Sequence, residues 1–287
     1  RPPRSTPKPS SAASDVYKRQ INAKTHQFNN IVRFNRKFNR RHRVNAMIGL
    51  TYDVRDVENS IYAVEDFLTM QFTTNQPAYG NVVTRPLTYV KADQQIFSML
   101  GRVNYTFDNK YILTATVRRD GVSKFADNNQ YGVFPSVAFA WNAGNERFIQ
   151  NLDIFESLKF RAGWGQIGNH GIGPYGSLSN YGVSNLYGNA DGGTNVPIAL
   201  QNLSNPDLTW ETTEQSNFGV DFTTLNGVVS GNIDFYDKMT KDLLQNSEIP
   251  PSSGFTRILV NKGNITNKGV ELALNLTPIS TDDVELS

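Results

Sequence analysis

The chain of 287 residues carries 28 basic and 26 acidic side chains, and this formal charge of +2 gives no basic excess for a nucleic-acid partner. It contains no cysteine, which excludes a disulfide framework, thiolate catalysis and the commonest zinc sites. Its apolar runs all fall short of the ~18 residues that a membrane helix needs. Strands of a membrane barrel need only about 9–11 residues of alternating polarity, so that class remains open.

The first 20 residues differ in kind from the rest of the chain. Residues 1–14 are rich in Pro and Ser and show no hydrophobic period. Residues 15–20 resemble the translation of a transposase adapter used to prepare sequencing libraries. We therefore expect residues 1–20 to be a non-native or disordered leader, with an ordinary disordered linker as the alternative, and residues 21–287 to be the folded part.

Nine later segments alternate between apolar and polar residues, which is the pattern of strands with one dry and one wet face. In the last of them, Val270, Leu272 and Leu274 fall on one face, and Glu271 and Asn275 on the other. The predicted strands are 27–36, 42–55, 95–107, 111–119, 133–142, 157–167, 211–224, 227–241 and 265–277, with a stub that begins at Val284. No helical period separates them, so the sequence predicts a large antiparallel sheet.

The connections between these segments alternate between short and long. Short connections are expected at 37–41, 108–110, 225–227 and 278–283, with one of moderate length at 143–156. Long connections are expected at 56–94, 120–132, 168–210 and 242–264. Outer-membrane barrels have short turns on the periplasmic side and longer loops outside, whereas a soluble sandwich has no reason to sort its loops in this way.

Aromatic residues supply two sets of candidate positions. Those near strand ends are typical of an interfacial girdle, although packing in an ordinary β core is the alternative. The interfacial candidates are Phe107, Tyr111, Trp141, Trp164, Trp210 and Tyr236. Tyr175, Tyr181 and Tyr187 lie in a loop rich in Gly and Asn, where they would stack on sugar faces or peptide side chains as ligand contacts.

Motifs for catalysis, cofactors and metals find no support in the sequence. Residues 163–168 satisfy the dinucleotide fingerprint, but no helix is expected after them to bind a pyrophosphate, so we interpret the glycines as small residues on a strand. The histidines His26, His42 and His170 lack the spacing of a zinc site. We therefore expect no catalytic residue, no cofactor and no metal.

Several segments resemble the SusC/RagA family of TonB-dependent outer-membrane transporters from bacteria of the Bacteroidetes type. Residues 118–125 read RRDGVSKF and lead into GVFPSV at 132–137 and AW at 140–141. Residues 158–165 read LKFRAGWG, with GN at 168–169. Further matches follow in the family's order at 210–211, 219–221, 236–237, 240–244, 250–255 and 267–271. Val122 and Gly163 stand where the family more often has Ser.

This resemblance implies an all-β fold, a partial antiparallel transmembrane β-barrel with about 9–10 strands of a barrel of roughly 22, without the plug domain. It implies import of a glycan or peptide, not an enzymatic reaction, in the cell outer membrane of a Bacteroidetes-like Gram-negative bacterium. The implied partners are outer-membrane lipid, a SusD-like surface lipoprotein as lid, and the TonB complex through an amino-terminal region that this sequence lacks.

Two other classes of protein remain as alternatives. A soluble secreted β-protein that binds carbohydrate would use the same tyrosine-rich loops, and it would bury its apolar faces between two packed sheets. A β-rich glycoside hydrolase would need two carboxylates about 5–10 Å apart across a cleft. Glu211 and Glu214 begin one strand together but fall on opposite faces.

Overall fold

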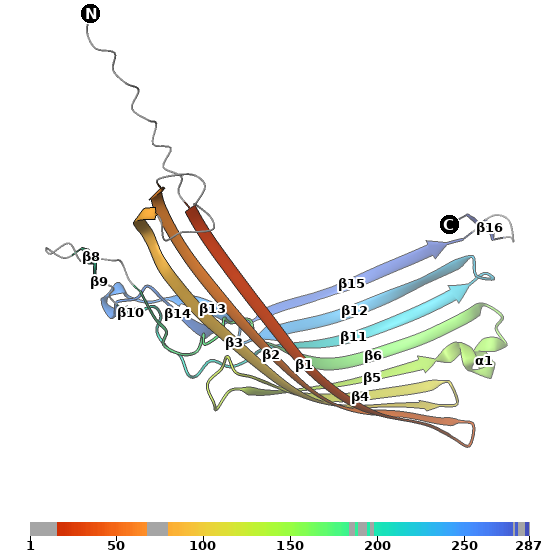
Figure 1. Cartoon of the computed structure of the whole chain (residues 1–287). Coiled ribbons are helices and arrows are strands. Elements are labelled where there is room, and N and C mark those ends of the chain that lie inside the picture. Colours follow the sequence, from red (N-terminus) through yellow and green to blue (C-terminus); the bar gives the residue numbers. More distant parts are fainter. Residues whose placement is uncertain are drawn as a thin grey trace, which may run out of the picture. The chain divides into compact units, whose positions relative to one another are not determined.

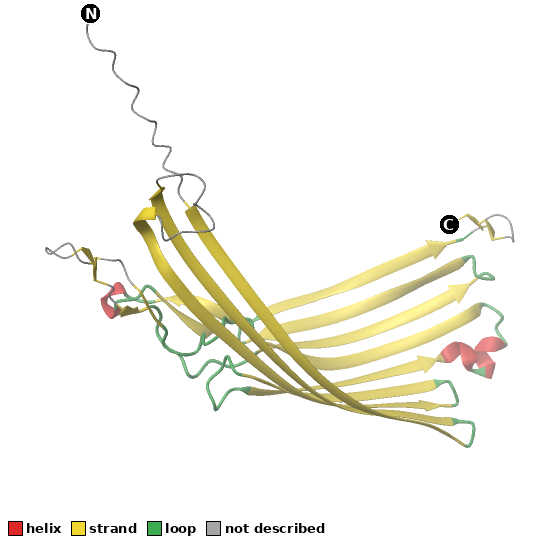
Figure 2. Ribbon diagram, in the orientation of Figure 1, coloured by secondary structure: helices red, strands yellow, loops and turns green. Residues whose placement is uncertain are grey.

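The computed structural model describes residues 16–67, 80–183, 187–188, 194–195, 198–277, 279–280 and 285–286. Strands dominate these residues (Figures 1 and 2). The elements are β1 (Val16–Phe38), β2 (His42–Phe67), β3 (Gly80–Phe107), β4 (Tyr111–Val122), β5 (Tyr131–Asn142), η3 (Ala143–Asn145), α1 (Arg147–Gln150), β6 (Phe155–Asn169), β7 (Tyr181–Val183), β8 (Tyr187–Gly188), β9 (Thr194–Asn195), β10 (Ile198–Leu200), β11 (Glu211–Thr224), β12 (Val229–Lys241), β13 (Leu244–Glu248), η4 (Pro251–Ser253), β14 (Arg257–Asn261), β15 (Ile265–Leu276), β16 (Ile279–Ser280) and β17 (Glu285–Leu286). Among the described residues, no helix has the length and apolar character needed to cross a bilayer.

The chain divides into two units. The smaller unit comprises residues 1–26 and 54–94, and the larger comprises residues 27–53 and 95–287. In the smaller unit the described residues belong to β1, β2 and β3, and the Arg19 guanidinium donates a hydrogen bond to Asn59 Oδ1 at 3.3 Å. Val64 is the buried apolar residue of its described part.

The nine predicted strands all form, and they are joined in one sheet of order β1-β2-β3-β4-β5-β6-β11-β12-β15. From β3 onward every neighbouring pair is antiparallel and consecutive in the sheet. Since the pairs are antiparallel, the turns 108–110, 143–154 and 225–228 gather at one end, and the connections 123–130, 170–210 and 242–264 gather at the other. The connections therefore alternate between the two ends as predicted, but their lengths do not sort completely, because 123–130 at the long-loop end is shorter than 143–154 at the short-turn end.

Three predictions about the regions outside these strands were incomplete or wrong. Most of the connection expected at 56–94 is strand, because β2 runs on to Phe67 and β3 begins at Gly80. Polar residues occupy both faces there, so the alternation that marks a half-buried strand is lost. The long loops also contain the hairpins β7–β10 and β13–β14, which were not predicted.

The predicted leader and the predicted stub are described only in part. Residues 16–20 lie in β1, whereas residues 1–15 lie outside the described residues, and the leader at 1–20 stays a prediction. Near the other end, β16 pairs with β17. Val284, where the stub was expected to begin, lies outside the described residues, as does most of the expected turn 278–283.

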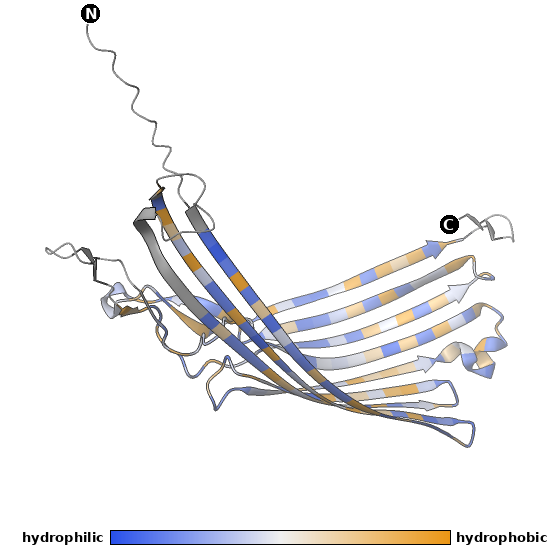
Figure 3. Cartoon of the chain, in the orientation of Figure 1, coloured by the Kyte–Doolittle hydropathy of each residue, from blue (hydrophilic) through white to orange (hydrophobic). Residues whose placement is uncertain are grey.

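The strand register gives the sheet of the larger unit two different faces. Phe139, Ala162, Phe218, Phe235 and Val270 lie side by side on five successive strands and form an apolar row. The adjacent row of paired residues lies on the opposite face and contains Arg161, Gly219, Asp234 and Glu271. Figure 3 shows this alternation of hydrophobic and hydrophilic residues along the strands.

The apolar face is exposed over many large side chains. Leu272 of β15 retains 67% exposure, and Phe218 and Phe235 retain 47% each although they lie on strands with neighbours on both sides. A soluble sandwich would cover this face with a second sheet, but none of the described residues packs over it in that way. The apolar face therefore has the character of a surface that lipid covers.

Buried side chains gather at the long-loop end rather than between two layers. The cluster contains Val122, Phe125, Phe134, Ile172, Leu208 and Trp210, with Ile96, Leu244 and Leu259 packed against it. These residues come from β3, β4, β5 and the three long connections, so the cluster ties the loops to the end of the sheet. We refer to this set as the loop core.

Candidate functional site

A recess with charged walls lies beside the loop core, on the polar face of the sheet. Its volume is about 450 Å³. The lining residues come from β2 to β6 and from the segments around His170 and Trp210; they are Asp53, Ile96, Leu100, Arg102, Thr116, Arg118, Asp120, Phe134, Ser136, Gln166, Ile167, Gly168, His170 and Trp210. Aromatic, cationic and anionic groups thus meet at one place near the long loops.

The RRDG motif builds one wall of this recess. Arg118 and Asp120 are two residues apart on β4 and share the polar face, so the Arg118 Nε donates to both carboxylate oxygens of Asp120 at 2.7 Å. The same guanidinium donates to Ser98 Oγ on β3 at 3.3 Å, and both Ser98 and Asp120 are buried. Charge-assisted bonds of this length are among the strong polar contacts of proteins. They hold the charged wall in one arrangement.

Arg119, the residue between Arg118 and Asp120, lies on the opposite face of the sheet. Arg119 points away from the recess, and its guanidinium carbon lies 4.3 Å from the centre of the Tyr131 ring on β5. The Tyr131 ring also covers Gly121, where an added Cβ would overlap it. The motif therefore forms an ion pair on the polar face of the sheet and a cation–π contact on the opposite face.

Trp210 forms the floor of the recess and is a core residue. Its ring centre lies 5.5 Å from that of Phe125 and 5.4 Å from those of Phe134 and His170, and its indole N–H donates to the Gln130 carbonyl at 3.3 Å. Only 7% of Trp210 is exposed. The prediction of an interfacial position for Trp210 is therefore wrong, because the residue precedes β11 and folds under the long loops.

His170 lies at the edge of the recess, where its surroundings favour the neutral form of the imidazole. Burial lowers the pKa of its imidazole below 6.5, and the nearby charge of Lys124 lowers this pKa further. The Lys124 Nζ lies 3.5 Å from His170 Nδ1. Asp120 acts in the opposite direction, but its effect on the pKa is smaller.

The fingerprint-like glycines of β6 accommodate side chains rather than a nucleotide. β6 continues through Gly168 to Asn169, and no helix begins in the described residues 170–183, as the sequence predicted. The ring of Phe134 lies over Gly168, so that an added Cβ there would overlap it. Gly168 therefore makes room for one wall of the recess.

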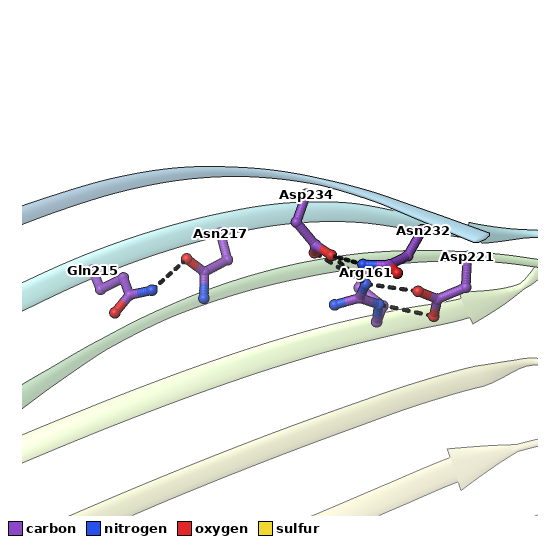
Figure 4. Close-up of polar contacts among 6 residues, drawn as sticks. All are labelled: Arg161, Gln215, Asn217, Asp221, Asn232 and Asp234. Atoms are coloured by element: carbon purple, nitrogen blue, oxygen red, sulfur yellow. Dashed lines mark hydrogen bonds and ion pairs between the residues drawn. The ribbon is translucent and has the colours of Figure 1, made fainter. Parts of the chain in front are cut away.

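A second polar cluster, further along the same face, was not predicted. Arg161 binds Asp221 through two hydrogen bonds of 2.9 and 2.7 Å and also pairs with Asp234 at 3.0 Å. Asn232 donates to Asp234 at 2.6 Å (Figure 4). Gln215 and Asn217, joined by a hydrogen bond of 2.8 Å, lie further along β11. The only sequence signal for this cluster was that Arg161 and Asp221 fall within the segments that carried the family resemblance.

The tyrosines proposed as ligand contacts do not line the recess. Tyr175 lies in the loop after β6 with a backbone φ of 56°, and Tyr181 begins β7. Both are exposed. Tyr187 belongs to β8, and its side chain lies outside the described residues. Their role as ligand contacts thus remains a prediction.

The interfacial candidates separate into two groups. Phe107, Tyr111 and Trp141 form a row that continues to Phe160; successive ring centres are 6.3, 6.4 and 5.5 Å apart. The register places this row on the apolar face at the short-turn end. Trp164 lies on the same face, and its indole N–H donates to Glu214 at 2.9 Å.

Tyr236 does not belong with these residues. It pairs with Asn217 and Gly269 in the strand register and therefore lies on the polar face, where its hydroxyl donates to Asn267 at 3.4 Å. The interfacial assignment of Tyr236 is wrong by one step along β12, since Phe235 holds the position on the apolar face.

Comparison with known proteins decides the class of this sheet. A family model described as "TonB dependent receptor-like, beta-barrel" matches residues 4–284. The chain belongs to the TonB-dependent receptor family. The predicted all-β fold, a partial antiparallel barrel, is confirmed, and so is the assignment to a family of transport proteins rather than enzymes. Proteins of this family lie in the bacterial outer membrane.

Individual relatives support the SusC/RagA type. TonB-dependent receptor P26 of Formosa agariphila is 35% identical over 267 residues, which cover 92% of this chain and 27% of that protein. SusC of Bacteroides thetaiotaomicron is 38% identical over 191 residues, or 66% of this chain and 19% of that protein. The structure of the RagAB peptide transporter superposes with a TM-score of 0.84 at 26% identity, over 97% of this chain and 30% of the other. The chain spans about a quarter of the length of the curated relatives named here.

Proposed function

We propose that this chain is part of the barrel of a transporter that imports glycan or peptide nutrients across the outer membrane of a Bacteroidetes-like Gram-negative bacterium. A SusD-like surface lipoprotein would serve as its lid. The TonB complex would supply energy through the amino-terminal region of the complete protein. The similarity to SusC and to the RagAB peptide transporter supports the proposal.

The observation that carries this proposal is the two-faced sheet. The strand register sends Phe218 and Phe235 to a face suited to lipid, and Arg161 and Asp234 to a face suited to water. A transporter wall needs both faces, because it separates the hydrocarbon of the membrane from a hydrated interior. Import breaks no bond in the nutrient, so the wall needs no acid–base pair.

We infer that the recess beside the loop core is a first contact site for the nutrient. It lies on the hydrated face at the end of the long loops, which face outward in barrels of this kind. Arg118 and Asp120 hold each other in place, so they present fixed charge and unused hydrogen-bonding groups to a ligand. The lining includes cationic and anionic groups beside an aromatic floor, which suits a peptide or a polar glycan.

The proposal is tested with the complete receptor. The gene that contains this segment is deleted, and accumulation of fluorescent oligosaccharides and oligopeptides is measured in cells with and without a plasmid copy. We expect the plasmid copy to restore accumulation of one nutrient class, and a protonophore to abolish it. Accumulation that is independent of the gene, or that survives loss of the proton gradient, would contradict energised import.

The lipoprotein partner is tested separately by affinity purification of the tagged receptor from outer membranes. We expect a surface lipoprotein to co-purify in near-equal amount. Purification of the receptor alone, from membranes in which transport is intact, would contradict the lipoprotein lid but would leave the assignment as a transporter unchanged.

A further inference from the structure

The connection between β5 and β6 at the short-turn end exposes apolar side chains on a well-fixed scaffold. It contains η3 and α1, and it lies beside the turn between β11 and β12 (Figure 1). Phe148, Leu152 and Ile154 of the connection and Leu225 of the neighbouring turn are 53–64% exposed. We call residues 143–154 together with residues 225–227 the turn platform.

Polar contacts fix one side of the turn platform to the β3–β4 turn. The Glu146 carboxylate binds Lys110 Nζ at 2.7 Å and accepts a hydrogen bond from the Tyr111 hydroxyl at 2.8 Å. These two donors lower the pKa of Glu146 below its usual range, with Lys110 as the larger cause. The side-chain amides of Asn142 and Asn145 both donate to the Asn109 carbonyl, at 2.9 and 3.1 Å.

The other side of the turn platform is fixed to β6 and β11. Ala143 is fully buried, and a Cβ on Gly144 would approach the backbone nitrogen of Leu158 to 2.9 Å. The Thr224 hydroxyl donates to the Ile154 carbonyl at 2.6 Å, which joins the connection to the β11–β12 turn. The exposed apolar side chains therefore stand on a packed scaffold rather than on a loose loop.

Leu225 is an unusual residue for its position. Its backbone φ is 59°, in the left-handed region that favours Asn and Gly in tight hairpin turns. A leucine there is strained, and burial of its side chain in this chain does not compensate for the strain. A contact with something outside this chain would therefore explain the exposed side chain of Leu225 better than the folding of the chain does.

The turn platform continues the exposed apolar face, which has the character of a surface that lipid covers. Tyr111 and Trp141 belong to the aromatic row on the apolar face, and Tyr111 binds Glu146 directly. The turn platform begins where this row ends, at the height where aromatic side chains of barrels meet lipid headgroups. A protein partner is disfavoured because four side chains cannot supply the ~1,200 Å² of a standard interface.

We propose that the turn platform is a membrane anchor, which inserts Phe148, Leu152, Ile154 and Leu225 among the phospholipids of the periplasmic leaflet. Amphipathic segments of this kind bury their apolar side about 5–10 Å into the boundary between headgroups and acyl chains. The anchor fixes the depth of the barrel, because the polar contacts of Glu146 and Thr224 transmit the position of the turn platform to three turns of the sheet.

Spin labels in the complete receptor test this anchor. The variants L152C and L225C report on the turn platform, L272C on the exposed apolar face, and S252C on the long-loop end. Residues 1–287 contain no cysteine, and any cysteine in the rest of the receptor is first replaced by serine. Each labelled receptor is reconstituted in vesicles of phosphatidylethanolamine and phosphatidylglycerol. Collision rates of the label with oxygen and with a water-soluble nickel chelate then give its depth.

We expect the oxygen-to-nickel ratios of L152C and L225C to lie between that of the lipid reference L272C and that of the water reference S252C. Ratios equal to that of S252C would overturn the proposal, because the turn platform would then lie in water. Labels that collide with neither reagent would also overturn it, because a protein surface would then cover the turn platform. Heat-modified migration on gels confirms that each variant is folded.

Discussion

Arg161 on β6 and Asp234 on β12 form an ion pair of 3.0 Å although strand β11 lies between them. The register explains how they meet, because Gly219 of β11 pairs with Arg161 on one side and with Asp234 on the other. A Cβ at Gly219 would overlap the Asp234 carboxylate and approach the guanidinium carbon of Arg161 to 2.8 Å. Because Gly219 has no side chain, Arg161 and Asp234 can contact each other across β11.

The first prediction concerns this glycine. Gly219→Ala should push Arg161 and Asp234 apart. Because the new Cβ meets the ends of two flexible, partly exposed side chains, the loss of barrel stability should be about 0.2–1 kcal/mol, as for a partly exposed ion pair. The measurement is the temperature at which the complete receptor loses its heat-modifiable migration. Gly163→Ala is the matched control, because a Cβ there meets its neighbours at an ordinary 3.8 Å. Equal stability of the two variants would show that the space above Gly219 is not needed.

The alternation of the sequence predicted the sheet well, for a physical reason that Phe160 and Arg161 illustrate. A strand turns successive side chains to opposite faces, so an apolar face in lipid and a polar face in water leave a period of two in the sequence. The same logic failed at residues 56–67, where both faces carry polar groups. It also failed for Tyr236, since proximity to a strand end does not tell which face a residue takes.

Features that depend on strand register or on loop packing could not be predicted from the sequence. The contact of Arg161 with Asp234 requires the offset of three strands, which no local pattern contains. Trp210 was assigned by its place before a strand, whereas its burial depends on loops distant in the chain, including Phe125 and His170. Arg118 and Asp120 belonged only to a motif that carried the family resemblance, and the recess that they line and their pairing became visible in the structure.

The second prediction concerns the charged wall of the recess. Asp120→Ala removes the carboxylate that binds Arg118, and because the Arg118 side chain is 52% exposed, the loss of stability should be about 0.2–1 kcal/mol. Nutrient accumulation should fall as well, since Arg118 loses its fixed position. The control is Asp127→Ala in the exposed loop between β4 and β5, which should change neither quantity. Full accumulation by the Asp120 variant would exclude a role for this wall in binding.

The third prediction is a pH dependence of the loop packing at His170. Burial lowers the pKa of the folded imidazole below 6.5, so the opened loop binds more protons than the closed one between the lowered pKa and 6.5. Loop packing is thus fully stable above pH 6.5 and loses stability as the pH falls through that window. Hydrogen exchange of residues 170–178 should accelerate between pH 7 and pH 5.5, after correction for intrinsic rates. His170→Gln should remove this dependence; a pH profile unchanged by the substitution would assign it to other groups.

The fourth prediction uses a pair of substitutions at the recess. Gly168→Ala alone should destabilise the loop end, because the new methyl group would overlap the ring of Phe134. Phe134→Leu alone should also destabilise it, since it removes the ring that packs on Trp210 at 5.4 Å. In the double variant the smaller leucine leaves room for the methyl group. The two losses should therefore not add, and the coupling should be about 0.5–3 kcal/mol, as is usual for residues in contact. Melting of the four receptors by heat-modified migration measures it, and additive losses would show that Gly168 is kept for a reason other than the Phe134 ring.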